Sequence, residues 1–422
     1  MLYRRLNEFA KQNRPIRVAL IGAGSMGKGI AHQLSVVPGM QLVAVCDKDI
    51  QAAEIATAAY GRPAKRVDRS AAVSDAQVLV SDDPHFSQCG LHDVDYDVLV
   101  EATNSIGFAG QVCAAAIQAG RHVVLMNAEV DLALGGWLHQ LAQQHGVVVT
   151  SDAGDQHGVL VKLMDEIQLW GLRPVMAGNI KGFLDRYATA ESLQHEAAVR
   201  RLNPIQCCAY TDGTKLSIEM ALVANATGMV PTKPGMEGAR AEHVSEVLQL
   251  FDFEKYPDSG VVDYILGAEP GGGVFVVGHC EDTFQVPYLA YYKLGDGPFY
   301  VFYRPYHLCH LETPGAIAHA VLDGREILRA DAARVAEVFA FAKRDLQAGE
   351  PIETAIGGGS CYGMIDTIGH ADDRVPITLL ETQHDFEDVP RTKAAIARDQ
   401  PLRWSEIEMP ESQLMRLVTS HR

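Results

Sequence analysis

Residues 16–34 constrain the fold more than any other stretch of the sequence. They begin with the apolar run 16–21, which predicts a buried parallel strand, and they end in a helical pattern that contains Ile30 and Leu34. Between the strand and the helix lies the glycine-rich turn 22–27. A strand, a glycine turn and a helix in this order are typical of the phosphate-binding start of a dinucleotide-binding fold.

The three glycines of this turn have different expected roles. Gly22 makes the tight turn, Gly24 lets the backbone approach a pyrophosphate group, and Gly27 lets the helix pack closely on the strand. Ser25 and Met26 begin the helix, where the first backbone N–H groups are available to phosphate oxygens. We therefore assign these five residues to a cofactor site.

Asp47 is the expected partner of the cofactor's ribose. It ends the strand-like run 40–46, about 20 residues beyond the last glycine of the turn, where an acidic side chain binds the ribose 2′-hydroxyl. A 2′-phosphate would meet a like charge there, so Asp47 favours NAD over NADP. The positive charge of the adjacent Lys48 would attract a 2′-phosphate, which weakens this preference for NAD.

The sequence continues as an α/β fold with an N-terminal Rossmann doubly wound parallel sheet. Strand-like runs alternate with helical patterns, which implies parallel strands with ligands at their carboxyl ends. These runs lie at residues 77–80, 96–100, 122–126 and 147–150.

Polar residues in the loops after these strands are the expected neighbours of a nicotinamide ring. Thr103 follows one strand, Asn127 and Glu129 follow the next, and Asp155 follows a third. Asn127 and Glu129 could orient the substrate or act in proton transfer. Alternatively, Glu129 is a helix N-terminal acid that the helix dipole stabilises.

Length and charge narrow the classes of function. At 422 residues the chain is long enough for two or three domains, and its 47% hydrophobic and 21% charged residues are ordinary for a globular protein. Its formal net charge of −17 makes nucleic acid an unsuitable partner. An anionic small-molecule substrate would have to meet locally placed lysine and arginine side chains.

The sequence predicts a cytoplasmic protein. Residues 1–17 lack the apolar core of a signal peptide, and no stretch has the length and apolarity of a membrane span. The eight cysteines are dispersed without C-x-x-C spacing, which favours reduced and mostly buried thiols.

The pattern changes at about residue 154, where we expect an α+β middle domain. A helical stretch at 159–169 precedes a short strand at 174–177 and a polar loop at 178–182. Lys181 is the one charged residue of this loop, which favours a functional role for it.

A second lysine, Lys215, lies at the start of a later helix. Asp212 or Thr214 would cap this helix at its N-terminus, and Gly228 would end it. Lys215 and Glu219 are four residues apart on one helical face. One interpretation of this spacing is an exposed ion pair between the two side chains. The other is that Lys215 has a role in catalysis.

Further downstream, clustered aromatic residues at 300–303 predict another strand. Arg304, Tyr306 and His307 follow it and offer donors for an oxygen-rich or phosphorylated ligand, although a histidine here is as often a structural hydrogen-bonding group. The helical stretch 314–322 could return to complete the first domain.

From residue 331 the sequence predicts a small β-rich C-terminal domain. Its glycine-rich loop 357–360 suggests a flexible tip or a lid. The expected domains are therefore a dinucleotide-binding domain at 1–153, a substrate-binding and dimerisation domain at 154–330, and the C-terminal domain at 331–422.

Five motifs together resemble a known group of enzymes. They are GAGSMG at 22–27, MNAEVD at 126–131, DGTK at 212–215 with NATG at 225–228, SGVVDY at 259–264, and GPFYVFYRPYHL at 297–308. The chain resembles the homoserine-dehydrogenase-like oxidoreductases with a C-terminal SAF domain. Within these it looks closest to the type II (DXR-like) 1-deoxy-D-xylulose 5-phosphate reductoisomerases.

This resemblance implies hydride transfer from a nicotinamide coupled to rearrangement of a ketose phosphate, a step of isoprenoid biosynthesis. It implies that Lys181, Lys215 and Glu129 are catalytic, and that Asp155, Arg240, Arg304 and His307 contact the substrate. A lysine or a bound divalent cation would stabilise the developing negative charge on oxygen.

Two positions depart from the pattern of these enzymes. Homoserine dehydrogenases have a lysine after the asparagine of the second motif, where this chain has Ala128, and this argues against homoserine as the substrate. The reductoisomerases use NADPH, whereas Asp47 favours NAD. Relatives that act on a sugar acid or polyol in carbohydrate metabolism are therefore also consistent with the sequence.

Two alternatives belong to other functional classes. One is a simple NAD-dependent alcohol or homoserine-like dehydrogenase that leaves the carbon skeleton unchanged. The other is a ligand-sensing or assembly protein, because SAF modules also occur in binding proteins. For any of these we expect a homodimer, since the sheet edges of such a middle domain need covering.

Overall fold

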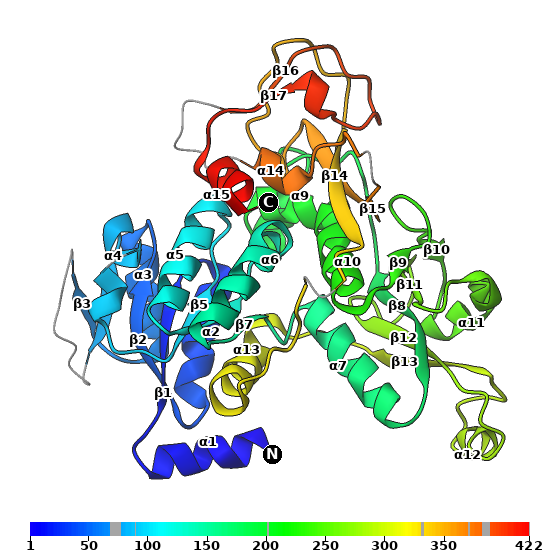
Figure 1. Ribbon diagram of the computed structural model, residues 1–422, viewed down its shortest axis with the longest axis horizontal. Helices are drawn as coiled ribbons and strands as arrows, with labels where there is room; N and C mark the ends of the chain where they lie inside the picture. The colour runs from blue at the N-terminus through cyan, green and yellow to red at the C-terminus, as the bar shows by residue number, and fades with distance from the viewer. Residues whose placement is uncertain are drawn as a thin grey trace. The chain divides into compact units, whose positions relative to one another are not determined.

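The computed structural model describes residues 1–67, 77–88, 90–200, 202–330, 333–369, 372–381 and 389–421. Its contacts define two compact units (Figure 1). The first consists of Met1–Asp155, Leu308–Arg329 and Arg416–Arg422, and the second of Gln156–His307 and Ala330–Met415. The expected boundaries at residues 153 and 330 between three domains stay a prediction.

The first unit contains a seven-stranded parallel sheet in the order β3-β4-β2-β1-β5-β6-β7, which confirms the predicted doubly wound α/β fold. The strand order reverses between β1 and β5, which is where ligands bind in sheets of this kind. The strands are β1 (Ile16–Ile21), β2 (Met40–Cys46), β3 (Ala64–Arg66), β4 (Val78–Ser81), β5 (Val98–Glu101), β6 (His122–Leu125) and β7 (Val149–Ser151).

Helices cover the apolar strands of this sheet. Val18 and Leu20 of β1 are fully buried and share a core cluster with Ile30 and Leu34 of α2. This burial explains why the strands carry almost continuous apolar runs. The helices are α1 (Leu2–Lys11), α2 (Ser25–Val36), α3 (Ile50–Tyr60), α5 (Gly107–Gln118) and α6 (Ala128–His145).

The chain returns to the first unit after residue 307, as the sequence suggested it could. Helix α13 (Cys309–Ala318) packs against α2, and its Ile317 is fully buried in the same core cluster. Gly29 of α2 permits this packing, because a Cβ atom there would lie 2.7 Å from the His310 ring.

The second unit is built on a mixed sheet in the order β10-β11-β8-β12-β13, with β9 paired to β11. Strands β10, β11 and β8 are parallel, whereas β12 is antiparallel to both β8 and β13. The strands are β8 (Arg173–Lys181), β9 (Val230–Pro231), β10 (Ala239–Arg240), β11 (Val261–Leu266), β12 (Val274–His279) and β13 (Phe299–Arg304).

Helix α10 (Thr214–Thr227) lies at the centre of the second unit (Figure 1). It packs on α7 (Gln156–Leu169) and on β8 and β11, and the hairpin of β14 (Ala336–Ala342) and β15 (Cys361–Thr367) packs on it as well. The Gly363 N–H donates to Thr214 Oγ1 at 2.8 Å, which ties the hairpin to the helix. As predicted, Gly228 ends α10 in a left-handed conformation.

Other described helices and strands are short. They are α4 (Pro84–Gln88), α8 (Gln194–Arg200), α9 (Pro204–Thr211), α11 (Val247–Leu250), α12 (Val286–Tyr291), α14 (Ile377–Leu380), α15 (Gln413–His421), β16 (Arg391–Thr392) and β17 (Ile407–Glu408).

Two local predictions for the second unit are wrong. Residues 178–182 are not a loop up to Lys181, because β8 continues to that residue between β11 and β12. The packing of β8 requires glycine at position 178, because a Cβ atom there would lie 2.3 Å from the Phe275 ring. The loop 357–360 is not a free tip, because Gly357 and Gly358 are buried and a Cβ atom on Gly357 would lie 2.1 Å from the Ile205 carbonyl oxygen.

The described cysteines are reduced, and six of these seven are buried. Cys89 lies outside the described residues. Among the described helices, none combines the length and the apolar composition that a bilayer crossing requires.

Candidate functional site

The glycine turn of the first unit has the geometry of a dinucleotide cradle. Gly22 has a φ of +89°, and a Cβ atom on it would lie 2.5 Å from the Ala102 carbonyl oxygen. A Cβ atom on Gly27 would lie 1.9 Å from the Gly22 carbonyl oxygen. Around a Cβ atom on Gly24, by contrast, no protein atom of the described chain lies within 4 Å. Gly22 and Gly27 are thus required by the fold, whereas Gly24 leaves space for a ligand.

The N-terminus of α2 completes the cradle. Gly24 is its N-cap, and Ser25, Met26 and Gly27 form the first turn, whose N–H groups have no partner within the helix. Such a terminus binds diphosphate through N–H groups and the helix dipole. These residues fit the pyrophosphate of a nicotinamide dinucleotide.

Asp47 lies beside the same turn. Its Oδ2 accepts a hydrogen bond from the Ala23 N–H at 2.6 Å, and its Oδ1 accepts one from the Asp49 N–H at 2.9 Å. Each carboxylate oxygen has two lone pairs, so both retain capacity for a ribose hydroxyl. The structure therefore brings Asp47 and the glycine turn together.

Asn127 and Glu129 lie at the start of α6. Asn127 is the N-cap: its Oδ1 accepts from the Val130 N–H at 3.3 Å, and its Nδ2 donates to the Ser105 carbonyl oxygen at 3.1 Å. Glu129 lies in the first turn of α6, which supports the helix-dipole interpretation of this residue. Both residues thus have a structural role, and a cofactor role for Asn127 stays a prediction.

Two buried carboxyl groups at the carboxyl ends of strands were not among the predicted site residues. Glu101 ends β5, and Oε1 of its side chain accepts from the Thr103 N–H at 2.7 Å and from the Thr103 hydroxyl. Burial raises the pKa of Glu101 to about 8, and the nearby Glu129 carboxylate adds to this shift. Glu101 therefore holds a proton at neutral pH.

Asp152 directly follows β7 and is fully buried. Burial raises its pKa to about 7, although its Oδ2 accepts from the Gly154 N–H at 2.7 Å. Carboxyl groups with a pKa near neutrality can donate or accept protons under physiological conditions. In the sequence, both Glu101 and Asp152 could have been recognised as acidic residues at the end of an apolar strand.

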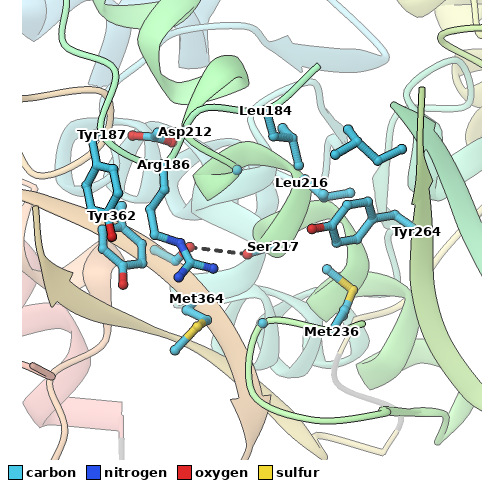
Figure 2. Close-up of a pocket in the computed structure, with 14 residues that line it drawn as sticks. Leu184, Arg186, Tyr187, Asp212, Leu216, Ser217, Met236, Tyr264, Tyr362 and Met364 are labelled. Atoms are coloured by element: carbon cyan, nitrogen blue, oxygen red, sulfur yellow. Dashed lines mark hydrogen bonds between the residues drawn. The ribbon is translucent and has the colours of Figure 1, made fainter. Parts of the chain in front are cut away.

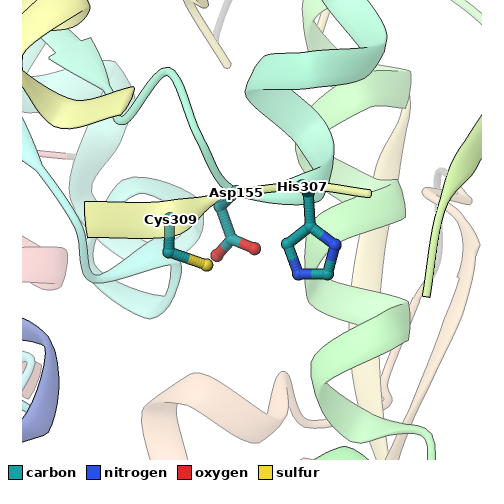
Figure 3. Close-up of side chains that lie close together, drawn as sticks. All are labelled: Asp155, His307 and Cys309. Carbon is teal, nitrogen blue, oxygen red and sulfur yellow. The ribbon is translucent and has the colours of Figure 1, made fainter. Parts of the chain in front are cut away.

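Asp155 and Cys309 are close together in the first unit. Asp155 is buried, and its carboxylate lies within 4.8 Å of the Cys309 sulfur. Figure 3 shows both side chains. Asp155 was predicted as a substrate contact, and this role stays a prediction.

In the second unit, Lys181 belongs to a polar cluster between β8, α7 and α10. Its Nζ donates to Gln156 Oε1 at 2.9 Å and lies 3.7 Å from Glu219 Oε2. Asn179, two residues earlier on the same face of β8, donates from Nδ2 to the same Glu219 oxygen at 3.4 Å. Among the described residues no partner is found for Asn179 Oδ1, which is buried.

Glu219 therefore has a different role from the one expected. Its side chain is 2% exposed and faces Lys181, so the exposed position expected for Glu219 is wrong. Sequence spacing indicated that Glu219 shares a helical face with Lys215, but it could not show that β8 covers this helix. Lys215 lies in the first turn of α10 and is half-buried.

The other predicted substrate contacts gather at the same end of the second sheet as Lys181. Arg240 pairs with Leu266 of β11, and Leu266 pairs with Lys181. On the other side, Arg304 ends β13, and its guanidinium lies 4.7 Å from the centre of the Tyr306 ring.

His307 lies close to the same end of β8. Its Nδ1 contacts the Gly272 carbonyl oxygen at 2.8 Å, and the Gly272 N–H donates to the Ile180 carbonyl oxygen at 2.9 Å. Three cationic side chains and one histidine thus surround one end of a sheet, an arrangement that suits an anionic substrate.

Two families match separate parts of the chain. Residues 22–151 match the family described as homoserine dehydrogenase, NAD binding domain, and residues 154–313 match the one described as oxidoreductase DRL, catalytic domain. The Lys181 cluster and the residues at that end of the sheet fall within the second match. No curated protein matches the chain.

Solved structures similar to the chain include several dehydrogenases. A homoserine dehydrogenase from Thiobacillus denitrificans is 18% identical over 80% of this chain and 84% of its own, with a TM-score of 0.44. A myo-inositol 2-dehydrogenase from Lactobacillus plantarum is 14% identical over 74% and 91%, with a TM-score of 0.41. A 1-deoxy-D-xylulose 5-phosphate reductoisomerase from Zymomonas mobilis, in complex with NADPH, is 12% identical over 62% and 64%, with a TM-score of 0.38.

The cradle and the family matches define an NAD(P)-dependent oxidoreductase. More particularly, a cofactor domain similar to that of homoserine dehydrogenase precedes a catalytic domain similar to that of the oxidoreductase DRL.

Proposed function

We propose that this oxidoreductase acts on a small sugar phosphate or sugar acid and couples hydride transfer to rearrangement of its carbon skeleton. Its reaction would be of the type that 1-deoxy-D-xylulose 5-phosphate reductoisomerase carries out. A bound nicotinamide dinucleotide supplies the group that accepts or donates the hydride.

The observation that carries the proposal is the cluster of Lys181, Glu219 and Gln156 at the end of β8. Gln156 and Glu219 hold the Lys181 ammonium in one place, and its side chain is only 15% exposed. A fixed cation in a poorly hydrated site stabilises negative charge on a substrate oxygen. Lys181 Nζ can also give a proton to that oxygen or take one from it.

Two arginines and one histidine would bind the anionic end of the substrate. Arg304, Arg240 and His307 lie at the same end of the second sheet as Lys181. Guanidinium groups bind phosphate and carboxylate in a bidentate manner, which fixes the substrate's orientation. The catalytic roles expected for Lys215 and Glu129 stay predictions.

The cofactor is the point on which two candidate functions differ. Asp47 beside the glycine turn favours NAD, since its carboxylate would repel a 2′-phosphate. This observation favours the second candidate, an NAD-dependent alcohol or homoserine-like dehydrogenase that leaves the skeleton unchanged.

The decisive experiment is a turnover assay with product identification. The purified protein is incubated with 1-deoxy-D-xylulose 5-phosphate, with and without Mn²⁺, and with NADPH and NADH in separate reactions. Absorbance follows the nicotinamide, and mass spectrometry and NMR identify the product. In parallel, a panel of sugar acids and polyols is offered with NAD in the oxidising direction.

A product with a rearranged skeleton supports the reductoisomerase function, and the Mn²⁺ arm measures the predicted divalent metal requirement. Hydride transfer with an unchanged skeleton supports the simple dehydrogenase instead. If NADH binds tightly and no sugar phosphate reacts, the substrate belongs among the sugar acids and polyols.

The proposal includes two further predictions. We propose that residues 331–422 form a SAF-type domain, and that the chain is a homodimer. Light scattering that gives the mass of one chain at micromolar concentration would exclude the dimer.

A further inference from the structure

The second unit contains a pocket of about 300 Å³ that the Lys181 cluster does not line. The pocket lies between β11, the first turns of α10, β15 and the segment that follows β8, as Figure 2 shows. None of the predicted catalytic or substrate-binding residues contributes to its wall.

The volume and the walls limit what the pocket can hold. At roughly 30 Å³ for each water molecule, it has space for a ligand of about ten non-hydrogen atoms. Part of the wall is apolar and is formed by Leu184, Leu216, Leu266, Met236 and Met364. Such walls favour a ligand with an apolar body.

Most polar groups of the wall already have partners. Asp212 accepts from Lys343 at 2.7 Å, so its charge is neutralised within the protein. The Ser217 hydroxyl donates to a carbonyl oxygen at 3.2 Å. The hydroxyls of Tyr187 and Tyr362 both bond to Asp399, at 2.9 and 3.1 Å. None of these groups needs a ligand.

Arg186 differs from these groups. Its guanidinium lies 5.1 Å from the centre of the Tyr362 ring, and in Figure 2 it points toward the middle of the pocket. No carboxylate of the described residues forms an ion pair with it. The cation is therefore available to a ligand.

Tyr264 supplies a second polar group from β11, and its ring extends toward the centre of the pocket (Figure 2). Burial raises the pKa of its phenol, and the positive charges of Arg186 and Arg240 oppose this shift. The hydroxyl thus remains protonated and lies within the electrostatic reach of Arg186. No hydrogen-bond partner for it is found among the described residues.

We propose that this pocket is a second binding site, separate from the Lys181 cluster, for a small organic carboxylate with an apolar body. Arg186 pairs with the carboxylate, the Tyr264 hydroxyl donates to it, and the leucine and methionine side chains enclose the rest of the ligand. A carboxylate fits better than a phosphate ester, because one cation and one phenol do not balance a doubly charged group.

Calorimetric titration of the full chain, without cofactor or substrate, tests this proposal. Benzoate is the probe, benzamide is the neutral comparison, and phenyl phosphate is the dianionic one. We expect benzoate to bind at concentrations up to about 10 mM, and benzamide and phenyl phosphate to bind at least about tenfold more weakly.

Variants show where the probe binds. R186Q should abolish benzoate binding, whereas the matched change R391Q, at an exposed arginine outside the pocket, should not. L184W places an indole in the pocket from a loop position and should abolish binding as well. Lys181→Met should leave binding unchanged, so the result is independent of the proposed redox function. The melting temperature of each variant confirms that it is folded.

Three results would overturn the proposal. The first is equal affinity for benzoate and benzamide, and the second is unchanged benzoate binding by folded R186Q or L184W. The third is the absence of benzoate binding to the unmodified chain. Tighter binding of phenyl phosphate than of benzoate would overturn the assignment to a carboxylate.

Discussion

The Lys343 ammonium lies 2.7 Å from Asp212 Oδ2, and the two side chains are 2% and 0% exposed. The same ammonium donates to the carbonyl oxygens of Ala188 and Gly358, at 2.8 and 2.7 Å, and lies 3.3 Å from Cys208 Sγ. One buried cation thus joins three other segments of the second unit, at residues 188, 208–212 and 358.

Lys343→Met should destabilise the second unit strongly. The substitution leaves the Asp212 carboxylate buried without its cation, which typically costs about 3–5 kcal/mol. Urea unfolding followed by the fluorescence of Trp170 and Trp404, both in this unit, measures the change.

A double variant that also changes Asp212 to leucine removes both charges and should recover most of the loss. Lys255→Met, at a fully exposed lysine, is the matched control and should change stability little. If Lys343→Met unfolds like the control, the ion pair does not hold these segments together.

Two glycines of the cradle should respond to alanine in opposite ways. Gly22→Ala forces a left-handed conformation on alanine, which costs about 1–2 kcal/mol, and places its Cβ against Ala102. It should therefore lower the melting temperature. A Cβ atom on residue 24 meets no atom of the described residues within 4 Å, so the Gly24→Ala variant should keep its stability but bind NADH about tenfold or more weakly.

Thermal unfolding and an NADH fluorescence titration separate these effects. A Gly24→Ala variant that binds NADH as tightly as the unmodified protein would show that the pyrophosphate does not approach this residue.

The buried Glu101 should make stability depend on pH. Its pKa is about 8 in the folded chain and near the ordinary glutamate value of 4.5 when unfolded, so between these values the folded state holds a proton that the unfolded state has lost. The stabilisation is complete below about pH 4.5 and is lost as the pH rises toward 8.

Glu101→Gln cannot titrate and should remove part of this decline. The measurement is the free energy of unfolding of both proteins at several pH values between 5 and 9, a range that spans the folded-state pKa of about 8. Asp152, whose pKa burial raises to about 7, contributes a decline of the same sign in both proteins. Parallel curves for the two proteins would mean that Glu101 is ionised in the folded state.

Alanine substitutions at Gly178 and Gly182 test whether β8 is a packed strand at residue 178. Gly178→Ala should destabilise the second unit by about 1–3 kcal/mol, because its Cβ would lie 2.3 Å from the Phe275 ring. Gly182→Ala meets no atom within 4 Å among the described residues and should be neutral. Equal unfolding midpoints for both variants would contradict the packed strand.

Lys181→Met should lower turnover by about 100- to 10,000-fold and leave NADH affinity unchanged, because it removes the group that stabilises charge and moves a proton. Lys255→Met is again the matched control. A variant that retains more than about a tenth of the turnover would exclude Lys181 from the chemical step.

The sequence alone predicted the first sheet in detail because its signals are local. Expected strands at 16–21 and 40–46 coincide with β1 and β2, and the roles of Gly22 and Gly27 follow from a turn of six residues. Asp47 was found by its spacing from that turn. Strand β3 has no such apolar run, and it was missed.

The second unit depends on contacts that the sequence does not display. Lys181 was found because it is an isolated charge, but Glu219, Asn179 and Gln156 were not recognised as its neighbours. Glu219 and Gln156 lie on helices whose covering strand is separated from them by about 25 to 40 residues. The same holds for Lys343, which reaches Asp212 only because the β14–β15 hairpin packs on α10.

The sequence by itself thus determined the class of fold, the cofactor cradle and the lysine on which the proposed chemistry depends. The tertiary structure decided which charges are buried, which carboxyl groups have a raised pKa, and that a pocket with one available arginine exists beside α10. Local geometry follows from short-range patterns, whereas burial and electrostatic partners arise only when distant segments pack against one another.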